Sequence, residues 1–214
     1  MKSSYLSRTW VSPKVAAGKS QIHGKGVIAK DKITEGEKIM KFGGESISRQ
    51  AAFSGSYRTR SIWIVSENNF LALPNSDTQE SLDEYLNHSC DANTWLTDEV
   101  ILVAKRDIEP DEEITLDQGT WNFEYEEYVD NKEACSCGAS NCRHVLTKDD
   151  WKLPEVQEEY KNHFHPMIQK MINKGKWKCG NGKWGQDPLF ACSHSNKVQR
   201  NQRPTPLDKG VRRG

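Results

Sequence analysis

The sequence predicts a mainly β protein with a helical part near its C-terminal end, a β+α fold. Three observations lead to this class. Over about the first 120 residues, short apolar stretches alternate with turn residues, which is typical of short strands. From Leu153 to Asn173 the apolar spacing becomes helical. After Gly175 the chain is rich in Gly, Asn, Lys and Pro, and we expect disorder from about residue 193 on.

Two similar stretches are each predicted to form a strand, a turn and a second strand. "AKDKITEGEKI" covers Ala29–Ile39, and "AKRDIEPDEEI" covers Ala104–Ile114. Apolar residues flank Gly36 in the first stretch and Pro110–Asp111 in the second, and these are turn residues.

Further elements are expected from local patterns. "ISRQAAFSG" (Ile47–Gly55) predicts a short helix that ends at its glycine. "SIWIVSENNFLAL" (Ser61–Leu73) predicts a hairpin with Glu67–Asn69 at its tip, and "WLTDEVILVA" (Trp95–Ala104) predicts another strand pair. In the helical segment Leu153–Asn173, Pro166 is expected to kink or split the helix.

Composition favours a compact core with poorly packed segments. The 214 residues suit one domain, or one domain with a small appendage. Hydrophobic residues make up 35% and charged residues 28%, and the mean hydropathy is −0.81. No apolar run approaches the roughly 18 residues of a membrane span, and the first residues lack the apolar stretch of a secretory signal. We therefore expect a soluble intracellular protein, cytoplasmic or nuclear, with no membrane contact.

The net charge of zero conceals two opposite halves. Residues 1–150 carry 17 Lys and Arg against 25 Asp and Glu, and residues 151–214 carry 13 against 5. An acidic body favours a basic partner such as a Lys-rich peptide. The basic tail could make weak contact with nucleic acid or fold back onto the body, although solvated surface charge is the preferred interpretation.

The cysteines indicate a metal site. Without a secretory signal, metal ligation is favoured over disulfides for the six cysteines. "CSCGASNC" places Cys135, Cys137 and Cys142 in one short loop, which suits three of the four ligands of tetrahedral zinc. Water or a distant residue would supply the fourth, and Cys90 is the natural candidate. A second site from Cys179, Cys192 and His194 has irregular spacing, and we favour unliganded residues there.

Two further motifs have ordinary alternatives when taken alone. "YLNHSCDANTWL" (Tyr85–Leu96) could be a polar turn between strands. "HGKGVIA" (His23–Ala29) allows a ligand to approach the backbone closely, or is a simple loop entry.

Together, these motifs resemble a known family. "HGKGVIA", "FGGE", "YLNHSCDAN", "DEEITLDQG" and "CSCGASNC" follow the order and spacing of a SET domain with a post-SET zinc loop, over roughly Ser20 to Arg143. The run "VLTKDDWKLPEVQEEYKNHFHP" is also similar to the C-terminal part of a bacterial-type SET subgroup. The resemblance implies an S-adenosylmethionine-dependent protein-lysine methyltransferase acting on a basic, Lys-containing protein. It also implies a fold of small β-sheets with a pseudoknot.

The resemblance divides the chain into five parts. We expect an N-terminal segment (1–19), the SET domain (20–130), the post-SET zinc loop (131–150), a helical extension (151–175) and a basic tail (176–214).

The resemblance also assigns roles to residues. Asn87 would bind the methionine end of the donor, and the backbone at His88 would bind its adenine. Gly24, Lys25 and Gly26 would line the donor with backbone groups, and Trp151 would extend the wall over it. Cys90 would complete a structural zinc site with Cys135, Cys137 and Cys142.

The chain departs from the family at the expected reaction centre. The usual "TYDY" or "TFDY" is "TLDQ", so Gln118 replaces the tyrosine beside the reacting methyl, and Leu116 replaces the aromatic residue that tunes the number of methyls. The proline of "SCDPN" is Ala92, and the arginine that usually opens the motif is Glu84. A replacement hydroxyl could come from Tyr57, Tyr85, Tyr125 or Tyr128.

Three explanations of these changes remain open: a working variant site, a slow enzyme, or a SET module that binds without turnover. A zinc-bearing nucleic-acid binder is a further alternative. Its basic and aromatic stretch would be residues 174–184, for which we favour a loosely packed extension.

Overall fold

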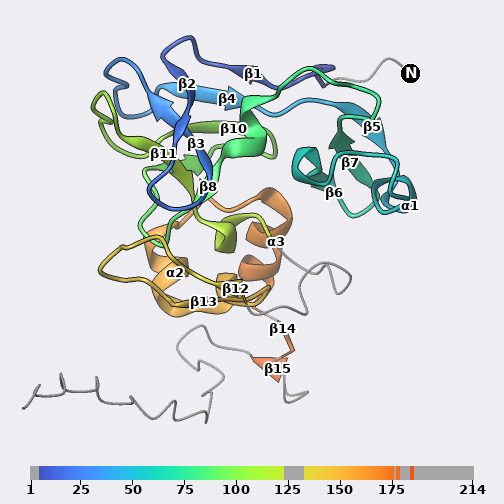
Figure 1. Ribbon diagram of the computed structural model, residues 1–214. Coiled ribbons are helices and arrows are strands. Elements are labelled where there is room, and N and C mark those ends of the chain that lie inside the picture. The colour runs from blue at the N-terminus through green and yellow to red at the C-terminus, as the bar shows by residue number, and fades with distance from the viewer. Residues whose placement is uncertain (1–4, 123–132, 176, 179–183, 186–214) are drawn as a thin grey trace, which may run out of the picture.

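The computed structural model describes residues 5–122, 133–175, 177–178 and 184–185 (Figure 1). The described part consists mostly of small β-sheets with few helices, which confirms the predicted fold class. Within these ranges, every helix is too short or too polar to cross a bilayer. Cys179, Cys192, His194 and the end of the basic tail lie outside the described residues, so the predictions made for them stay predictions.

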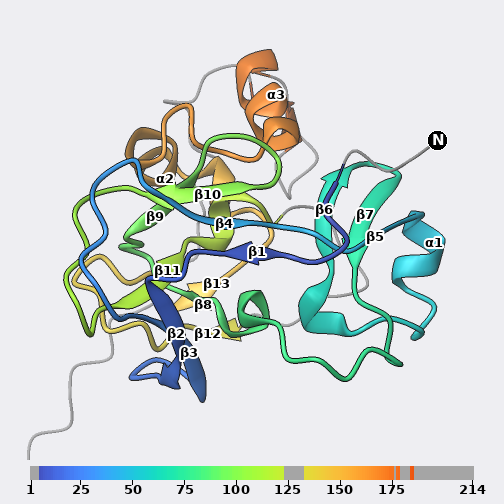
Figure 2. The same ribbon diagram turned by 90° about the horizontal axis from the view of Figure 1, so that it is seen from above.

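The first sheet has the order β1–β4–β10–β9, and all its strands are antiparallel (Figure 2). Its strands are β1 (Trp10–Val11), β4 (Lys38–Lys41), β9 (Thr94–Leu96) and β10 (Ile101–Ala104). The pair β9–β10 confirms the strand pair expected over Trp95–Ala104.

The second sheet brings the "YLNHSC" motif to the "TLDQ" segment. Its order is β2 (Val15–Lys19), β3 (Lys25–Ala29), β11 (Glu113–Leu116) and β8 (Asn87–His88). The pair β8–β11 is parallel, with Asn87 opposite Thr115 and His88 opposite Leu116. Because the register is fixed by backbone pairing, Asn87 and His88 each have a defined neighbour on β11.

A third sheet stands to one side with the short helix α1, at the right of Figure 1. It has the order β5 (Glu45–Ile47), β7 (Asn69–Ala72), β6 (Trp63–Ser66). The hairpin β6–β7 and the helix α1 (Arg49–Ala52) confirm the elements expected over Ser61–Leu73 and Ile47–Gly55.

The two similar stretches meet each other. Ile33 and Ile108 form an isolated antiparallel bridge, and backbone bonds join Gly36 N to Ala104 O and Ala104 N to Glu37 O. The strands that flank each turn therefore belong to different sheets and do not pair as hairpins.

The helical segment is split as expected. Helix α2 (Pro154–Glu159) and helix α3 (Pro166–Lys174) each begin with a proline, which has no N–H to leave unpaired in the first turn. They lie below the sheets in Figure 1. Four short 3-10 helices connect the described elements: η1 (Thr59–Ser61), η2 (Leu82–Tyr85), η3 (Gln118–Thr120) and η4 (Asp150–Lys152).

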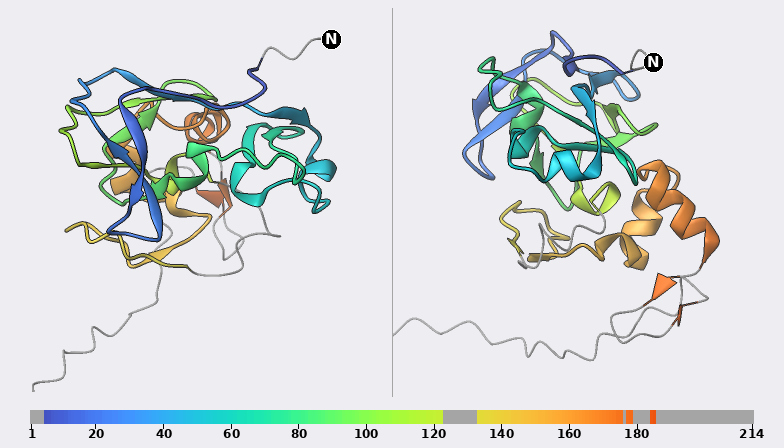
Figure 3. Two further views of the ribbon diagram at one scale, coloured as in Figure 1. Left: turned by 45° about the horizontal axis from the view of Figure 1, so that its top comes forward. Right: turned by 90° about the vertical axis from the view of Figure 1, so that its right-hand side faces the viewer.

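Buried residues fall into two clusters. The larger one joins the first two sheets and contains Ile33, Met40, Leu102 and Ile114. The smaller one joins the helices to the third sheet and contains Phe70, Trp151, Tyr160 and Ile168. The cysteine loop, with the two-residue strands β12 (Glu133–Ala134) and β13 (Val145–Leu146), runs beside the helices, as Figure 3 shows in gold. The pair β14 (Trp177–Lys178) and β15 (Trp184–Gly185) follows α3.

Candidate functional site

Asn87 ties the "HGKG" turn to strand β11. Its side chain is buried, and Nδ2 lies 3.0 Å from Lys25 O, 3.1 Å from His23 O and 2.7 Å from Glu113 Oε1. An amide group offers two hydrogens, so these acceptors surround a single donor group. The turn and the motif, 60 residues apart in sequence, are therefore one structural unit.

Glu113 joins Asn87 to Ser20 within this unit. Its carboxylate accepts from Ser20 Oγ at 2.8 Å, and Ser20 Oγ in turn accepts from the backbone N–H groups of Ile22 and His23. A Cβ at Gly26 would lie 2.4 Å from Glu113 Oε1. Glycine is therefore needed at this position for the carboxylate to reach Asn87.

Lys25 and Tyr85 meet at the surface of the same turn. Lys25 Nζ lies 2.8 Å from Glu80 Oε1 and 4.8 Å from the centre of the Tyr85 ring. The Tyr85 hydroxyl donates to Glu80 Oε1 at 2.6 Å. The hydrogen bond to Glu80 raises the pKa of Lys25. Tyr85 therefore stands with Lys25 at the turn.

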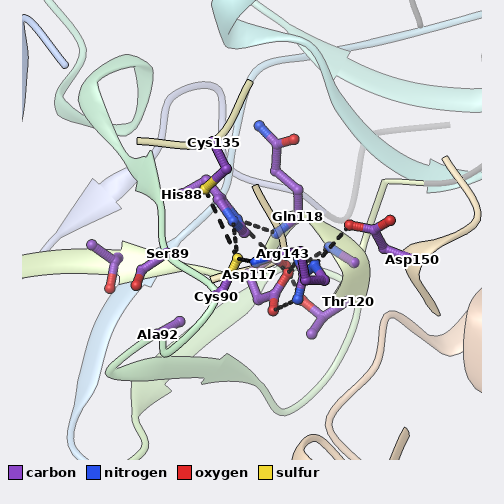
Figure 4. A network of polar contacts seen from close by, with 12 residues as sticks. His88, Ser89, Cys90, Ala92, Asp117, Gln118, Thr120, Cys135, Arg143 and Asp150 are labelled. Carbon is purple, nitrogen blue, oxygen red and sulfur yellow. Dashed lines mark hydrogen bonds and ion pairs between the residues drawn. The ribbon is translucent and has the colours of Figure 1, made fainter. Parts of the chain in front are cut away.

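His88 links the motif to Gln118. Its Nδ1 accepts from Gln118 N at 3.1 Å, so the ring proton belongs on Nε2, which lies 3.3 Å from Cys90 Sγ. Burial lowers the pKa of His88 to about 4, so the ring is neutral at neutral pH. In Figure 4 the side-chain amide of Gln118 points away from this network.

Four cysteines converge as the sequence predicted. The sulfur atoms of Cys90, Cys135, Cys137 and Cys142 all lie within 4.8 Å of one another, and those of Cys90 and Cys135 are 3.9 Å apart. Tetrahedral zinc with Zn–S bonds of about 2.3 Å needs sulfur atoms about 3.8 Å apart. The cluster therefore fits a four-thiolate metal ion.

The surroundings of the cysteine sulfur atoms act on them in two opposite ways. Backbone N–H groups of Arg143 and His144 donate to Cys90 Sγ and Cys142 Sγ, each at 3.4 Å. Burial raises the pKa of the Cys90 thiol and raises that of Cys135 to about 11. Metal binding would therefore displace protons from the cluster, which makes the affinity for metal depend on pH.

An ion-pair network lies directly beside the cluster (Figure 4). Arg143 Nη1 and Nη2 donate to the two carboxylate oxygens of Asp117 at 2.8 and 2.6 Å. Arg143 Nε and Asp150 Oδ2 lie 2.8 Å apart as an ion pair that lacks hydrogen-bond geometry. Burial alone would lower the pKa of Arg143, but the bonds to Asp117 and the charge of Asp150 keep it raised, so the guanidinium is always charged.

A cavity of about 350 Å³ adjoins Gln118. Part of its wall is an aromatic stack, in which the Trp63 ring lies 3.6 Å from that of Phe42 and 4.8 Å from that of Trp121. Asp83, Glu84, Leu146 and Thr147 also line it. The cavity is therefore lined by residues of the third sheet, helices η1 and η2, the end of η3 and the cysteine loop.

Several predicted residues lie away from this cavity. Leu116 is 2% exposed within the larger core cluster, and Trp151 is 4% exposed within the smaller one. The hydroxyls of Tyr57 and Tyr85 donate to Glu45 and Glu80. None of these four residues lines the cavity beside Gln118. Tyr125 and Tyr128 lie outside the described residues.

Comparison with known proteins finds a match to one family model. The family model for the SET domain matches residues 24–119. This match begins at Gly24 within the "HGKG" turn and contains the "YLNHSC" motif and the "TLDQ" segment, which the structure brings together. Residues 24–119 are therefore similar to a SET domain, and the relatives listed below are named as histone-lysine N-methyltransferases.

Named relatives agree with this family. The chain is 26% identical over 146 residues to an H3 lysine-4-specific histone-lysine N-methyltransferase of Aspergillus oryzae. It is 31% identical over 148 residues to the histone-lysine N-methyltransferase TRX1 of Oryza sativa. Each match covers 62% of this chain but only 11% and 14% of the relative, so the chain spans a small part of their length. The methyltransferase domain of human SETMAR has a TM-score of 0.47 at 20% identity, covering 64% of this chain and 59% of that one.

Sequence reasoning missed several charged residues that support the candidate site. Asp117, Arg143, Asp150 and Glu113 were given no role. A charged residue next to an apolar strand signals a buried carboxylate that needs a partner, and Asp117 after "EITL" fits that signal. The partner itself could not be identified, because Arg143 is 26 residues away.

Proposed function

We propose that this chain transfers a methyl group from S-adenosylmethionine to the side-chain amine of a lysine in a basic protein. One observation carries the proposal. The parallel pair β8–β11 joins Asn87, which holds the "HGKG" turn, to Gln118, which borders the cavity. Relatives named as histone-lysine methyltransferases support a lysine-bearing substrate, and histones are basic proteins.

The unit around Asn87 would hold the donor. In this proposal Asn87 and the backbone of Gly24, Lys25 and Gly26 bind its methionine end, and the backbone at His88 binds its adenine. The bound donor supplies an electrophilic methyl group on a sulfonium. Glu113 and Ser20 hold the turn before the donor arrives, so little ordering is left to oppose binding.

The cavity beside Gln118 would receive the lysine. Its aromatic wall offers an apolar surface, and a lysine that loses water against it has a lowered pKa, which favours the neutral amine that can react. The Gln118 amide can both donate to and accept from that amine. The chain's contribution is therefore to align the nitrogen and to keep water away.

The four cysteines would hold a structural zinc ion. All four positions are filled by thiolates, so none is open to substrate. The ion would fix the loop 135–142 against Cys90, next to Gln118.

One observation favours a second candidate function. In this alternative the chain is a SET module that binds without turnover. Gln118 replaces the hydroxyl expected at the reaction centre, and no tyrosine is among the residues that line the cavity in the described part of the chain. Such a module would bind the donor or a basic peptide and transfer nothing.

Labelled methyl transfer to a panel of basic proteins separates the two functions. We expect label on lysine with the wild type and more label with Gln118→Tyr, because the tyrosine restores a rigid hydroxyl-bearing wall. Gln79→Tyr, at an exposed position away from the cavity, serves as the control. Label with Gln118→Tyr alone would favour the binding module, and label on residues other than lysine would contradict the substrate class.

A further inference from the structure

We propose that Arg143 is a positioning residue. It couples the cysteine cluster to the Asp117–Thr120 segment, so that an ordered cluster holds Gln118 in place. The inference deepens the proposed function, because it names what holds the residue beside the reaction cavity. It rests on three sets of contacts made by one partly buried arginine, whose side chain is 11% exposed (Figure 4).

The first contact set fixes the arginine to the cluster. Arg143 directly follows Cys142, and its backbone N–H donates to Cys90 Sγ at 3.4 Å. The side chain of Asn141 holds the same loop from the other side, donating from Nδ2 to Cys90 O at 3.2 Å. A metal ion held by the four sulfur atoms would therefore also restrain the backbone at Arg143.

The second contact set fixes the Gln118 segment. The Asp117 carboxylate is fully buried and receives both terminal nitrogens of Arg143. Asp117 Oδ1 also accepts from Gly119 N at 2.8 Å, and Asp117 O accepts from Thr120 N and Oγ1. Asp117 thus caps helix η3, which begins at Gln118, and Arg143 balances the charge of the capping carboxylate.

The third contact set adds the helical extension. Asp150 Oδ2 lies 2.8 Å from Arg143 Nε, and Asp150 Oδ1 accepts from Thr147 N and Oγ1. Thr147 lines the cavity beside Gln118. One guanidinium therefore joins the cysteine loop, η3 and η4 around the same cavity.

Only an arginine has the geometry for this junction. The planar guanidinium offers a two-pronged face to Asp117 and a third nitrogen to Asp150, whereas a lysine offers one point charge. Leaving Asp117 buried without its cation is costly, so loss of Arg143 should loosen η3 while the four thiols stay in place.

A parallel link through His88 has to be separated from this one. Cys90 Sγ lies against His88 Nε2, and His88 Nδ1 accepts from Gln118 N. This link does not involve Arg143. If it alone carried the coupling, Gln118 would stay ordered when Arg143 is replaced.

Hydrogen exchange followed by mass spectrometry, with and without a zinc chelator, tests the proposal on the full chain. Two peptides are compared, one covering residues 115–122 and one covering 134–147, and zinc content is measured alongside. The variants are Arg143→Gln and the milder Arg143→Lys. The control is Arg106→Gln, which removes a similar two-pronged pair with Glu112 from the exposed surface.

In the wild type and in Arg106→Gln, we expect chelation to speed exchange at least tenfold in both peptides. In Arg143→Gln, the 134–147 peptide should keep its zinc-dependent protection, while the 115–122 peptide exchanges fast with and without zinc. Arg143→Lys should also lose zinc-dependent protection of the 115–122 peptide, but to a smaller extent. This variant keeps the test possible if Arg143→Gln does not fold. Zinc-dependent protection of 115–122 that survives both replacements would overturn the proposal. Because no donor or turnover is involved, this outcome is independent of whether the chain is an active enzyme.

Discussion

At the scale of single residues, His165 shows how burial fixes a protonation state. Its ring is fully buried, Nδ1 accepts from Met167 N at 3.3 Å, and Nε2 therefore carries the proton and lies 3.1 Å from Ile64 O. Burial lowers the pKa of His165 to about 4. A proton on Nδ1 would also remove the acceptor that begins helix α3.

This depressed pKa predicts that stability falls on acidification. Above pH 6.5 the ring is neutral in both the folded and the unfolded chain, so its protonation costs nothing. Between pH 6.5 and about 4 only the unfolded chain binds the proton, and the free energy of unfolding falls by up to about 3 kcal/mol. Urea unfolding at a series of pH values measures this loss.

His165→Asn is the matched variant for this prediction. Asparagine can still accept from Met167 N at the start of the helix but does not titrate. We expect it to be less stable than the wild type at pH 7 and less sensitive to acid. An unchanged pH dependence would show that other groups, such as His88, cause the loss.

Residue identities at the site were predictable to different degrees. The four cysteines could be predicted because three lie within eight residues and family spacing supplied the fourth. The Arg143–Asp117 pair could not, because it depends on how the cysteine loop folds back onto β11. Leu116 and Trp151 are core residues, and the roles predicted for them and for Tyr85 stay predictions.

At the scale of elements, strand β3 depends on Gly26. A Cβ at this position would lie 2.4 Å from Glu113 Oε1 and would displace the carboxylate that Asn87 and Ser20 hold. We expect Gly26→Ala to cost about 1–3 kcal/mol of stability and to weaken donor binding at least tenfold. Calorimetric titration with S-adenosylmethionine measures the second effect.

Gly18→Ala is the control on the neighbouring strand. Gly18 pairs with Gly26 in the β2–β3 ladder, but its Cβ would meet the side chain of Ile28, not the carboxylate. Donor binding should therefore survive there. Equal losses from both alanines would mean that strand packing, not the Glu113 contact, governs binding.

The four-cysteine cluster leads us to expect one zinc ion per chain. We expect close to one zinc ion per chain in the wild type and in Cys192→Ser, and loss of zinc with lower thermal stability in Cys137→Ser, because three thiolates bind zinc less tightly than four. Mass spectrometry of the native protein and thermal unfolding measure both. Full zinc content in Cys137→Ser would remove this cysteine from the site, and two zinc ions in the wild type would indicate a second site.

Local elements were easier to predict than their partners. The hairpin β6–β7 and the split at Pro166 follow from turn chemistry and from proline's missing N–H, so a short window of sequence contains the whole cause. The strands around Gly36 were found, but β3 and β4 pair in different sheets. Sheet partners depend on contacts over long sequence separations, which no local pattern contains.

At the scale of the whole molecule, the sheets, the helical extension and the cysteine loop surround one centre. The larger core cluster holds β11 against β3, and the smaller one packs α2 and α3 against the third sheet. Gln118 lies where these parts meet, bonded to His88 and bordering the cavity. The mainly β class could be predicted from local strand and turn patterns, and five separated motifs gave the family resemblance, whereas this shared centre became visible only in three dimensions.

The central claim is that the unit around Asn87 binds S-adenosylmethionine. Donor binding tests this claim most directly, because methyl transfer also depends on choosing the right substrate. The measurement is calorimetric titration of S-adenosylmethionine into the zinc-loaded wild type, beside Asn87→Ala and the control Asn75→Ala, whose amide donates to Gly55 O far from the motif. We expect saturable binding by the wild type and by Asn75→Ala, and none by Asn87→Ala. Absence of binding by the folded, zinc-loaded wild type, or unchanged binding by Asn87→Ala, would contradict the account.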